Sequence, residues 1–226
     1  MIRKALFLLL AAVSAPAASQ VSWYAGLSGG QAKTDSELVA NRESTITDAT
    51  DLRTDFDAKD TAWKGFFGLR LNPAVALELV YADLGRHRTH TTMQGGQPPL
   101  PAAISIDRRI SGYGVDLVAT PPLGWTNASL FGRIGAFRSR LEARASLEGN
   151  IVFTGGDVDE RARTTTRRET VLKAGLGGEW WFRPSAALRL EWERYLKVGK
   201  PFAVGGSGTT GEADTDVVTL GVLIRF

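Results

Sequence analysis

The chain has 226 residues, of which 43% are hydrophobic, and it carries a formal net charge of +3 with no cysteine. A mean hydropathy near zero and the lack of any run of about 18 apolar residues exclude a helical membrane protein. The balanced charge argues against nucleic-acid binding, and the absence of cysteine excludes disulfides and thiolate metal ligands. Transmembrane β-barrels are still allowed, because only every second residue of their strands faces lipid.

The first residues have the composition of a secretory signal peptide. A positively charged start leads into an apolar stretch at Ala5–Val13, and Ala15–Ala17 fits the small-x-small pattern that precedes cleavage. Cleavage after Ala17 and cleavage after Ser19 are both consistent with this pattern. We therefore expect residues 1–19 to be removed during export and residues 20–226 to form a single domain.

Alternation of apolar residues with small or charged ones predicts eight strands in the rest of the chain. Side chains point alternately to the two faces of a strand, so a two-residue period marks a strand whose faces differ. The predicted strands are, in chain order, residues 22–30, 63–71, 75–84, 104–120, 128–145, 167–182, 187–198 and 214–226. No helical period interrupts this pattern.

The connections between these strands alternate in length. Tight turns are expected at residues 72–73, 121–125 and 183–185, where proline, glycine and asparagine collect. Long polar loops are expected at residues 34–60, 85–103, 146–166 and 199–213. Short turns at one end and long loops at the other are typical of an outer-membrane barrel with four long extracellular loops.

The alternation alone leaves open which face points outward. A soluble lipocalin-like carrier keeps its apolar face inside, whereas a membrane barrel turns that face to lipid. One face carries six cations and five anions beside several glycines, as a filled, nearly neutral interior would. These charged residues form the predicted lumen network: Lys64, Arg70, Glu78, Asp116, Arg133, Lys173, Glu179, Arg189, Glu191, Glu193 and Arg225.

Aromatic residues gather near the strand ends on the opposite, apolar face. Such residues form girdles at the two membrane–water boundaries of a transmembrane barrel. The predicted girdle consists of Trp23, Trp63, Tyr81, Trp180, Phe182, Trp192 and Phe226. Both patterns favour a barrel whose apolar face meets lipid.

The sequence resembles the OmpA-like transmembrane domain family, most clearly over Trp63–Gly85, which is similar to that family's second hairpin. Further similar segments are Gly114–Leu117, Leu176–Phe182, Leu188–Trp192 and Leu220–Phe226. The resemblance implies an all-β, eight-stranded antiparallel up-and-down transmembrane β-barrel in the bacterial outer membrane. It also implies that Phe226 is the signal read by the outer-membrane assembly machinery.

Four residues fall where this family keeps lumenal salt-bridge partners, namely Glu78, Arg133, Glu179 and Arg189. Thr120 stands at the family's lysine position in the fourth strand, so the resemblance does not carry over gating by exchange of ion-pair partners. The chain ends with the barrel, and we therefore expect the peptidoglycan-binding domain of full-length members to be absent.

We expect a monomer with a structural or surface role, such as adhesion or recognition through the outer loops. The paired charges are expected to plug the lumen and allow at most weak pore activity. Outer-membrane lipid and lipopolysaccharide are the expected partners, and no catalysis, cofactor, metal or nucleic acid is expected. The sequence does not identify a partner for the loops.

Two observations support other partners or activities. His87 and His90, with Thr89, Thr91 and Asp83 nearby, leave open a small lipid A-modifying barrel enzyme, although no serine stands next to either histidine. Arginines that are candidates for binding lipopolysaccharide phosphates flank the predicted outer rim, where nearby acids partly offset them. These arginines are Arg86, Arg88, Arg108, Arg109, Arg138, Arg140, Arg144, Arg161, Arg163, Arg167 and Arg168.

Overall fold

The computed structural model describes residues 21–34, 50–56, 59–95, 100–149, 161–198, 202–203, 209–210 and 213–226. The predicted signal peptide lies outside these residues. Within the described ranges, no helix is long and apolar enough to cross a membrane.

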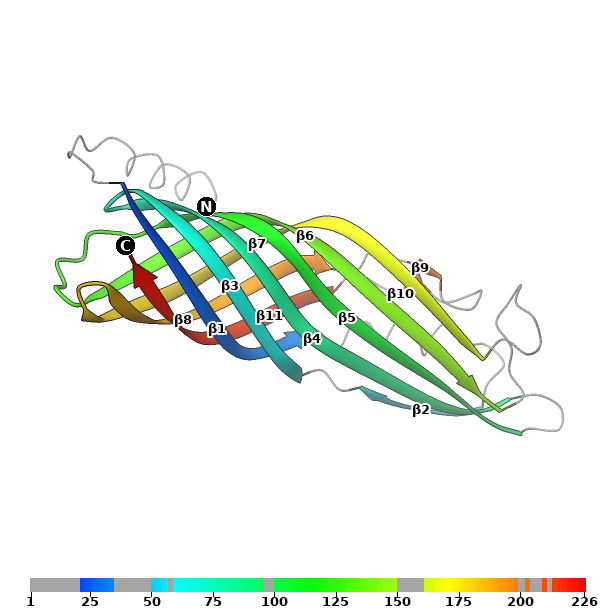
Figure 1. The fold of residues 1–226 in the computed structure, drawn as a ribbon. Helices are drawn as coiled ribbons and strands as arrows, with labels where there is room; N and C mark the ends of the chain where they lie inside the picture. Colours follow the sequence, from blue (N-terminus) through cyan, green and yellow to red (C-terminus); the bar gives the residue numbers. More distant parts are fainter. Residues whose placement is uncertain are drawn as a thin grey trace, which may run out of the picture.

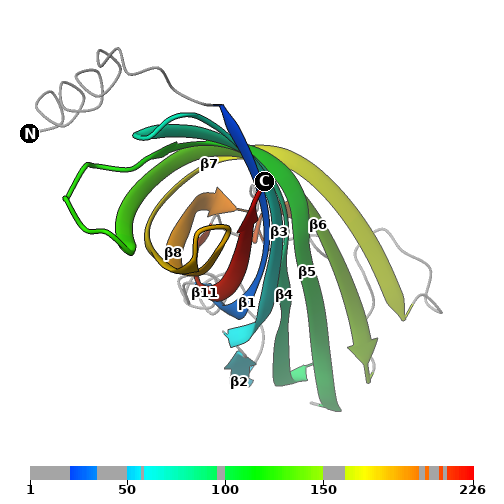
Figure 2. The same cartoon turned by 60° about the vertical axis from the view of Figure 1, so that its left-hand side comes forward.

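Eight long strands form a single closed ring. They are β1 (Ser22–Thr34), β3 (Lys59–Asn72), β4 (Val75–Gly95), β5 (Leu100–Ala119), β6 (Ala128–Glu148), β7 (Ala162–Arg183), β8 (Ala186–Val198) and β11 (Ala213–Arg225). Each strand pairs antiparallel with the next, and β1 pairs with β11 to close the ring. Figure 1 shows the tilted strands around a common axis, and Figure 2 shows the ring in a turned view. The predicted eight-stranded up-and-down barrel is confirmed.

One end of the barrel is formed by short connections. Asn72 Oδ1 accepts a hydrogen bond of 2.8 Å from the backbone N–H of Ala74, which closes the β3–β4 turn. Trp23 and Phe226 exchange backbone N–H···O=C bonds of 3.2 Å and 3.0 Å at the same end. The pairing of β1 with β11 that closes the ring therefore begins at the end with the short turns (Figure 1).

The apolar face of the sheet points outward and the charged face inward. Leu220 and Ile224 on β11 are 57% and 56% exposed, whereas Arg189 and Glu191 on β8 are 0% and 2% exposed. A soluble protein would reverse this arrangement, because exposed aliphatic side chains in water and buried charges both cost free energy. The outward apolar face confirms the predicted membrane orientation, and the lipocalin-like alternative is wrong.

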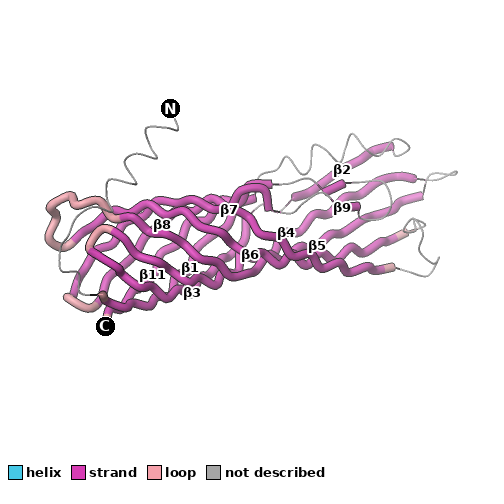
Figure 3. The backbone as a smooth tube through the Cα atoms, turned by 90° about the horizontal axis from the view of Figure 1, so that it is seen from above, coloured by secondary structure: helices cyan, strands magenta, loops and turns pink. Residues whose placement is uncertain are grey.

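Several strands are longer than predicted, and four of them, β4, β5, β6 and β7, rise past their neighbours. β4 continues to Gly95 and β5 begins at Leu100, so most of the loop predicted at residues 85–103 is strand. We call the projecting part the sheet extension, which comprises residues 84–95, 100–111, 139–148 and 162–172. Figures 1 and 3 show it standing on one side of the barrel, beyond the ends of β1, β3, β8 and β11.

The start of the extension alternates between two sets of polar residues. On β4, Arg86 and Arg88 are exposed while His87 and Thr89 are buried. Both sets are hydrophilic, so an apolar–polar period does not reveal them, although β-branched threonine favours strand. Short strands also occupy parts of two other predicted loops: β2 (Thr50–Phe56) pairs with the far end of β4, and β9 (Phe202–Ala203) pairs with β10 (Thr209–Thr210).

Candidate functional site: the charged lumen and the sheet extension

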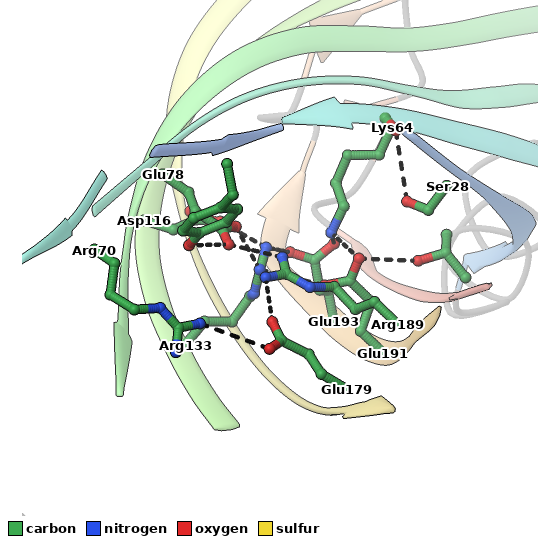
Figure 4. Close-up of polar contacts among 12 residues, drawn as sticks. Ser28, Lys64, Arg70, Glu78, Asp116, Arg133, Glu179, Arg189, Glu191 and Glu193 are labelled. Atoms are coloured by element: carbon green, nitrogen blue, oxygen red, sulfur yellow. Dashed lines mark hydrogen bonds and ion pairs between the residues drawn. The ribbon is translucent and has the colours of Figure 1, made fainter. Parts of the chain in front are cut away.

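The guanidinium of Arg133 on β6 lies at the centre of the lumen network. Its Nη2 donates to Glu78 Oε2 at 2.6 Å, and its Nη1 donates to Asp116 Oδ2 at 3.0 Å and to Glu193 Oε1 at 3.1 Å. Nη2 also lies 3.3 Å from Glu191 Oε2. The side chains of all five residues are at most 1% exposed. Figure 4 shows this convergence from four strands.

A second arginine, Arg189 on β8, crosses the barrel. Its Nη1 donates to Glu78 Oε1 at 2.7 Å and its Nη2 to Glu179 Oε1 at 2.6 Å. Its guanidinium stacks over Phe66 and Phe131, with 4.3 Å and 4.9 Å to the ring centroids. Arg189 is therefore neutralised in the plane of its guanidinium and covered by aromatic rings on its faces.

Two lysines complete the network. Lys64 Nζ lies 2.6 Å from Glu191 Oε1 and 2.7 Å from Glu193 Oε2. Lys173 Nζ lies 2.8 Å from Asp116 Oδ2 and 2.9 Å from Glu193 Oε1. Each lysine thus bridges two carboxylates, which limits the cost of holding its charge away from water.

Glycines on the inner face provide the space for these side chains. A Cβ atom at Gly135 would lie 2.0 Å from Asp116 Oδ1 and 2.5 Å from the Val115 carbonyl oxygen. A Cβ atom at Gly177 would lie 2.2 Å from the ring of Phe131. An eight-stranded interior is only just wide enough for side chains, so small residues opposite large ones are required.

The structure brings together ten of the eleven predicted lumen residues and leaves one outside. Arg70 is the outermost of the ten, with its Nη2 3.6 Å from Glu179 Oε2. Arg225 does not join the network, because it is the last residue of β11 and reaches only the mouth of the barrel. There it donates to the Pro184 carbonyl oxygen at 2.6 Å and stacks on Trp181 at 4.6 Å.

The mouth at the short-turn end holds a cavity of about 510 Å³. Arg70, Arg225, Trp181 and the β5–β6 connection line it. Thr120, which occupies the lysine position of the resembled family, also lines this cavity and not the ion-pair network.

Buried aromatic residues also belong to the lumen, and the sequence analysis did not include them. Tyr24 donates its hydroxyl hydrogen to Glu78 Oε1 at 2.7 Å. Tyr195 lies beneath Lys173, whose Nζ is 5.2 Å from the ring centroid. Their position on the inner face follows from strand alternation, and that signal was sufficient to find them.

The seven predicted girdle residues all point outward and are 39% to 67% exposed. Four of them lie toward the short-turn end, namely Trp23, Trp180, Phe182 and Phe226. Farther up the barrel Trp63 packs against Tyr81, with tilted rings whose centroids are 5.4 Å apart. Tyr113, opposite Tyr81 in the register and 65% exposed, extends the upper row and was missed. From Leu172 to Phe182 on β7 the outward face spans about 33 Å along the strand, or about 25 Å along the barrel axis, which matches an apolar membrane band.

The two histidines do not form a joint site. His87 points inward, where its Nε2 lies 3.2 Å from Thr34 Oγ1, whereas His90 has the outward parity of Arg88 and its Nδ1 lies 2.8 Å from Ser105 Oγ. Asp83 is paired with Arg109. In the part of the chain that the structure describes, no group of three or more His, Asp or Glu residues is placed to hold a metal ion.

The predicted rim arginines divide between the two faces of the sheet extension. Seven of them are exposed with outward parity: Arg86, Arg88, Arg109, Arg140, Arg144 and Arg168 on the extension, and Arg138 directly below it on β6. Arg108 is instead buried on the inner face, and Arg161 Nη1 donates to the Gly149 carbonyl oxygen at 2.7 Å.

A comparison with protein-family models matches residues 5–226 to the outer membrane protein beta-barrel domain. The chain belongs to this family. As an outer membrane beta-barrel it lies in the bacterial outer membrane. Among curated proteins, none matches the chain.

Several solved structures are similar to this outer membrane beta-barrel. The attachment invasion locus protein Ail of Yersinia pestis is 15% identical, with a TM-score of 0.47 and coverage of 92% of this chain and 99% of Ail. Neisserial surface protein A is 15% identical, with a TM-score of 0.45 and the same two coverages. OprG from Pseudomonas aeruginosa is 14% identical, with a TM-score of 0.44 and coverage of 92% and 98%.

Proposed function

We propose that this protein is a non-conducting, non-catalytic component of the outer membrane that acts in surface recognition or adhesion through its extracellular sheet extension. The observation that carries this proposal is the contact between Arg189 on β8 and Glu78 on β4 at 2.7 Å. These strands stand opposite each other in the ring, so the contact spans the barrel. Lys64 on β3 also reaches across the lumen to Glu193 on β8, a strand three places away in the ring.

A plugged lumen follows from these contacts. Ions cross a channel through water or through exposed polar groups, but the side chains that meet across this barrel are almost completely buried. Five cations and five anions pair within the network, so it carries no net charge that would select a permeating ion. The part of the molecule that supports contact with the exterior is then the sheet extension.

Planar-bilayer recording of the protein purified from outer membranes tests the plug. We expect no large, stable conductance from the wild-type protein, and at most brief, small openings. Arg189→Ala together with Arg133→Ala removes the side chains that fill the centre and serves as the positive control, because it is expected to open a measurable path. A steady porin-like current through the wild-type barrel would refute the proposal.

The non-catalytic part of the proposal rests on the separation of the two histidines. General-base activation of a nucleophile requires base, nucleophile and orienting acid in contact, and Asp83 is bound to Arg109 instead. Mass spectrometry of lipid A from cells expressing the wild type, the His87→Ala/His90→Ala variant or no barrel provides the test. Three identical profiles are expected, whereas a modification that depends on the histidines would establish an enzyme.

We also propose that residues 1–19 direct export and are removed, that Phe226 is read during outer-membrane assembly, and that the barrel is a monomer. The positive start, apolar stretch and small residues before Ser19 support the first of these. Phe226 supports the second, since it directly follows β11 with the outward parity of Ile224 and is 67% exposed.

A further inference from the structure

The outward face of the sheet extension continues the lipid-facing surface of the barrel, but its chemistry changes abruptly. Along β6, Ile134 and Ala136 are outward and apolar, and the next outward residues are Arg138 and Arg140. Along β5 the change falls at the same level, because Tyr113 is opposite Arg138 in the register. The boundary therefore coincides with the upper aromatic row, which marks the level of the lipid headgroups.

Above this boundary the strand register places arginines side by side. Arg140 on β6 stands opposite Arg168 on β7. One two-residue step higher in the register, Arg109 on β5 stands opposite Arg86 on β4. Arg144 follows on β6 after a further step. Each two-residue step along a tilted strand rises by about 5 Å, so the arginines cover about 15 Å above the aromatic row.

Four acids share this face: Glu148 lies at the far end of β6, and the other three are each bound to one arginine. Asp83 Oδ2 accepts from Arg109 Nη2 at 2.5 Å, and Asp107 Oδ1 accepts from Arg88 Nε at 2.7 Å. Glu142 Oε1 lies 2.6 Å from Arg140 Nη2. The hydrogen bond to Asp83 raises the pKa of Arg109 above its usual value, which keeps that guanidinium charged.

Four outward arginines then form a surplus of positive charge. Among the residues that the structure describes, the side chains of Arg86, Arg144 and Arg168 have no carboxylate within ion-pair distance. Arg138 donates to the hydroxyl of Thr170 at 3.1 Å and to no carboxylate in the same part of the chain. A guanidinium presents paired N–H donors that match two oxygens of a phosphate group.

We propose that this arginine field, the outward side chains of Arg86, Arg138, Arg144 and Arg168, binds the phosphate groups of lipopolysaccharide in the surrounding outer leaflet. The field sits flush with the lipid-facing wall and directly above its apolar band, so its nearest neighbours are the phosphates that cap that leaflet. This placement favours lipid over a soluble polyanion. The inference rests on the proposed surface role, because it assigns a ligand to the extension's outer face, but it is independent of the lumen plug.

Two double variants with the same net charge as each other test the assignment. Arg138→Gln/Arg168→Gln removes two cations from the field. Lys33→Gln/Lys59→Gln removes two exposed cations that face each other on β1 and β3, away from the arginine field. We measure binding by the wild type and both variants in detergent. The ligands are bisphosphorylated lipid A, dephosphorylated lipid A, inorganic phosphate and a heparin fragment. Heat-modifiable gel mobility checks that each barrel is folded.

The wild type is expected to bind bisphosphorylated lipid A at least about tenfold more tightly than dephosphorylated lipid A, since two charge-assisted contacts are lost in the latter. The arginine pair should lose about the same factor, while the lysine pair stays within about twofold of wild type. Equal affinity of wild type and arginine pair for lipid A would overturn the proposal. Tighter binding of inorganic phosphate or heparin than of lipid A would also overturn it, by assigning the field to a soluble anion. Conductance of the same preparations reports separately on the plug.

Discussion

Arg189 and Glu78 meet across the diameter of the barrel, with Nη1 2.7 Å from Oε1 and both side chains fully buried. The two residues come from strands that share no backbone hydrogen bonds. Their contact therefore fixes opposite walls of the ring to each other through side chains alone.

Removing one partner of this pair should destabilise the barrel strongly. Glu78→Gln leaves the fully buried side chains of Arg189 and Arg133 short of one negative charge, and an uncompensated buried charge costs about 3–5 kcal/mol. Urea unfolding of the lipid-reconstituted protein, followed by heat-modifiable gel mobility, measures the loss. Arg225→Gln at the mouth is the matched control, for which a change below about 1 kcal/mol is expected. Equal stability of Glu78→Gln and wild type would show that the network does not hold the walls together.

Glycine is required at the inner position 135 but not at the outer position 65. Gly135→Ala would press a methyl group against the Asp116 carboxylate and the Val115 carbonyl oxygen, and such overpacking costs about 1–3 kcal/mol. Gly65→Ala meets nothing closer than Leu27 Cδ1 at 3.9 Å. The same unfolding measurement should separate the two variants, and a Gly135→Ala barrel as stable as Gly65→Ala would contradict the packing described for the lumen.

The strand positions and the inner face were predicted from the sequence, because both depend only on local alternation. Lys64, Glu78 and Arg133 have inward parity whatever the register between strands. Which of them touch depends on the stagger of strands far apart in the chain, so the contact between Arg133 and four carboxylates was not accessible from spacing. Arg225 shows the same limit, since parity assigned it to the inner face but not to the mouth.

The sheet extension was missed for a different reason. Residues such as Arg86 and Thr89 alternate between exposed and buried positions, yet both are polar, so a hydropathy period does not distinguish them from a loop. Tyr113 was passed over as a girdle residue because it lies within its strand and not near a predicted end. Its neighbour in the register, Tyr81, would have located it if the pairing had been known.

A charge on the outward face should be tolerated near the membrane boundary and not at its centre. Leu220→Arg places a guanidinium in the middle of the apolar band, where the cost is about 2–4 kcal/mol. Val21→Arg adds the same side chain at the short-turn end, where about 0–1 kcal/mol is expected. Unfolding in lipid vesicles gives both values. If the two variants lose equal stability, Leu220 does not face hydrocarbon.

Phe226 is expected to act in assembly more than in stability. Phe226→Ser should lower the amount of barrel in the outer membrane of expressing cells, because the aromatic end is the feature proposed to be recognised. Refolding of the purified variant into detergent should proceed as for wild type, since the 3.0 Å bond from the Phe226 N–H to the Trp23 carbonyl uses backbone atoms alone. Normal membrane levels of the variant would reject the recognition role.

The seam between β1 and β11 is as regular as any other pairing in the ring, running without a break from Tyr24 opposite Arg225 to Thr34 opposite Thr215. A circular permutant that links residue 226 to residue 21 and opens the chain within residues 121–127 keeps every strand neighbour of the natural order. We expect such a permutant to reach the same closed ring in detergent, since no backbone ladder would be cut.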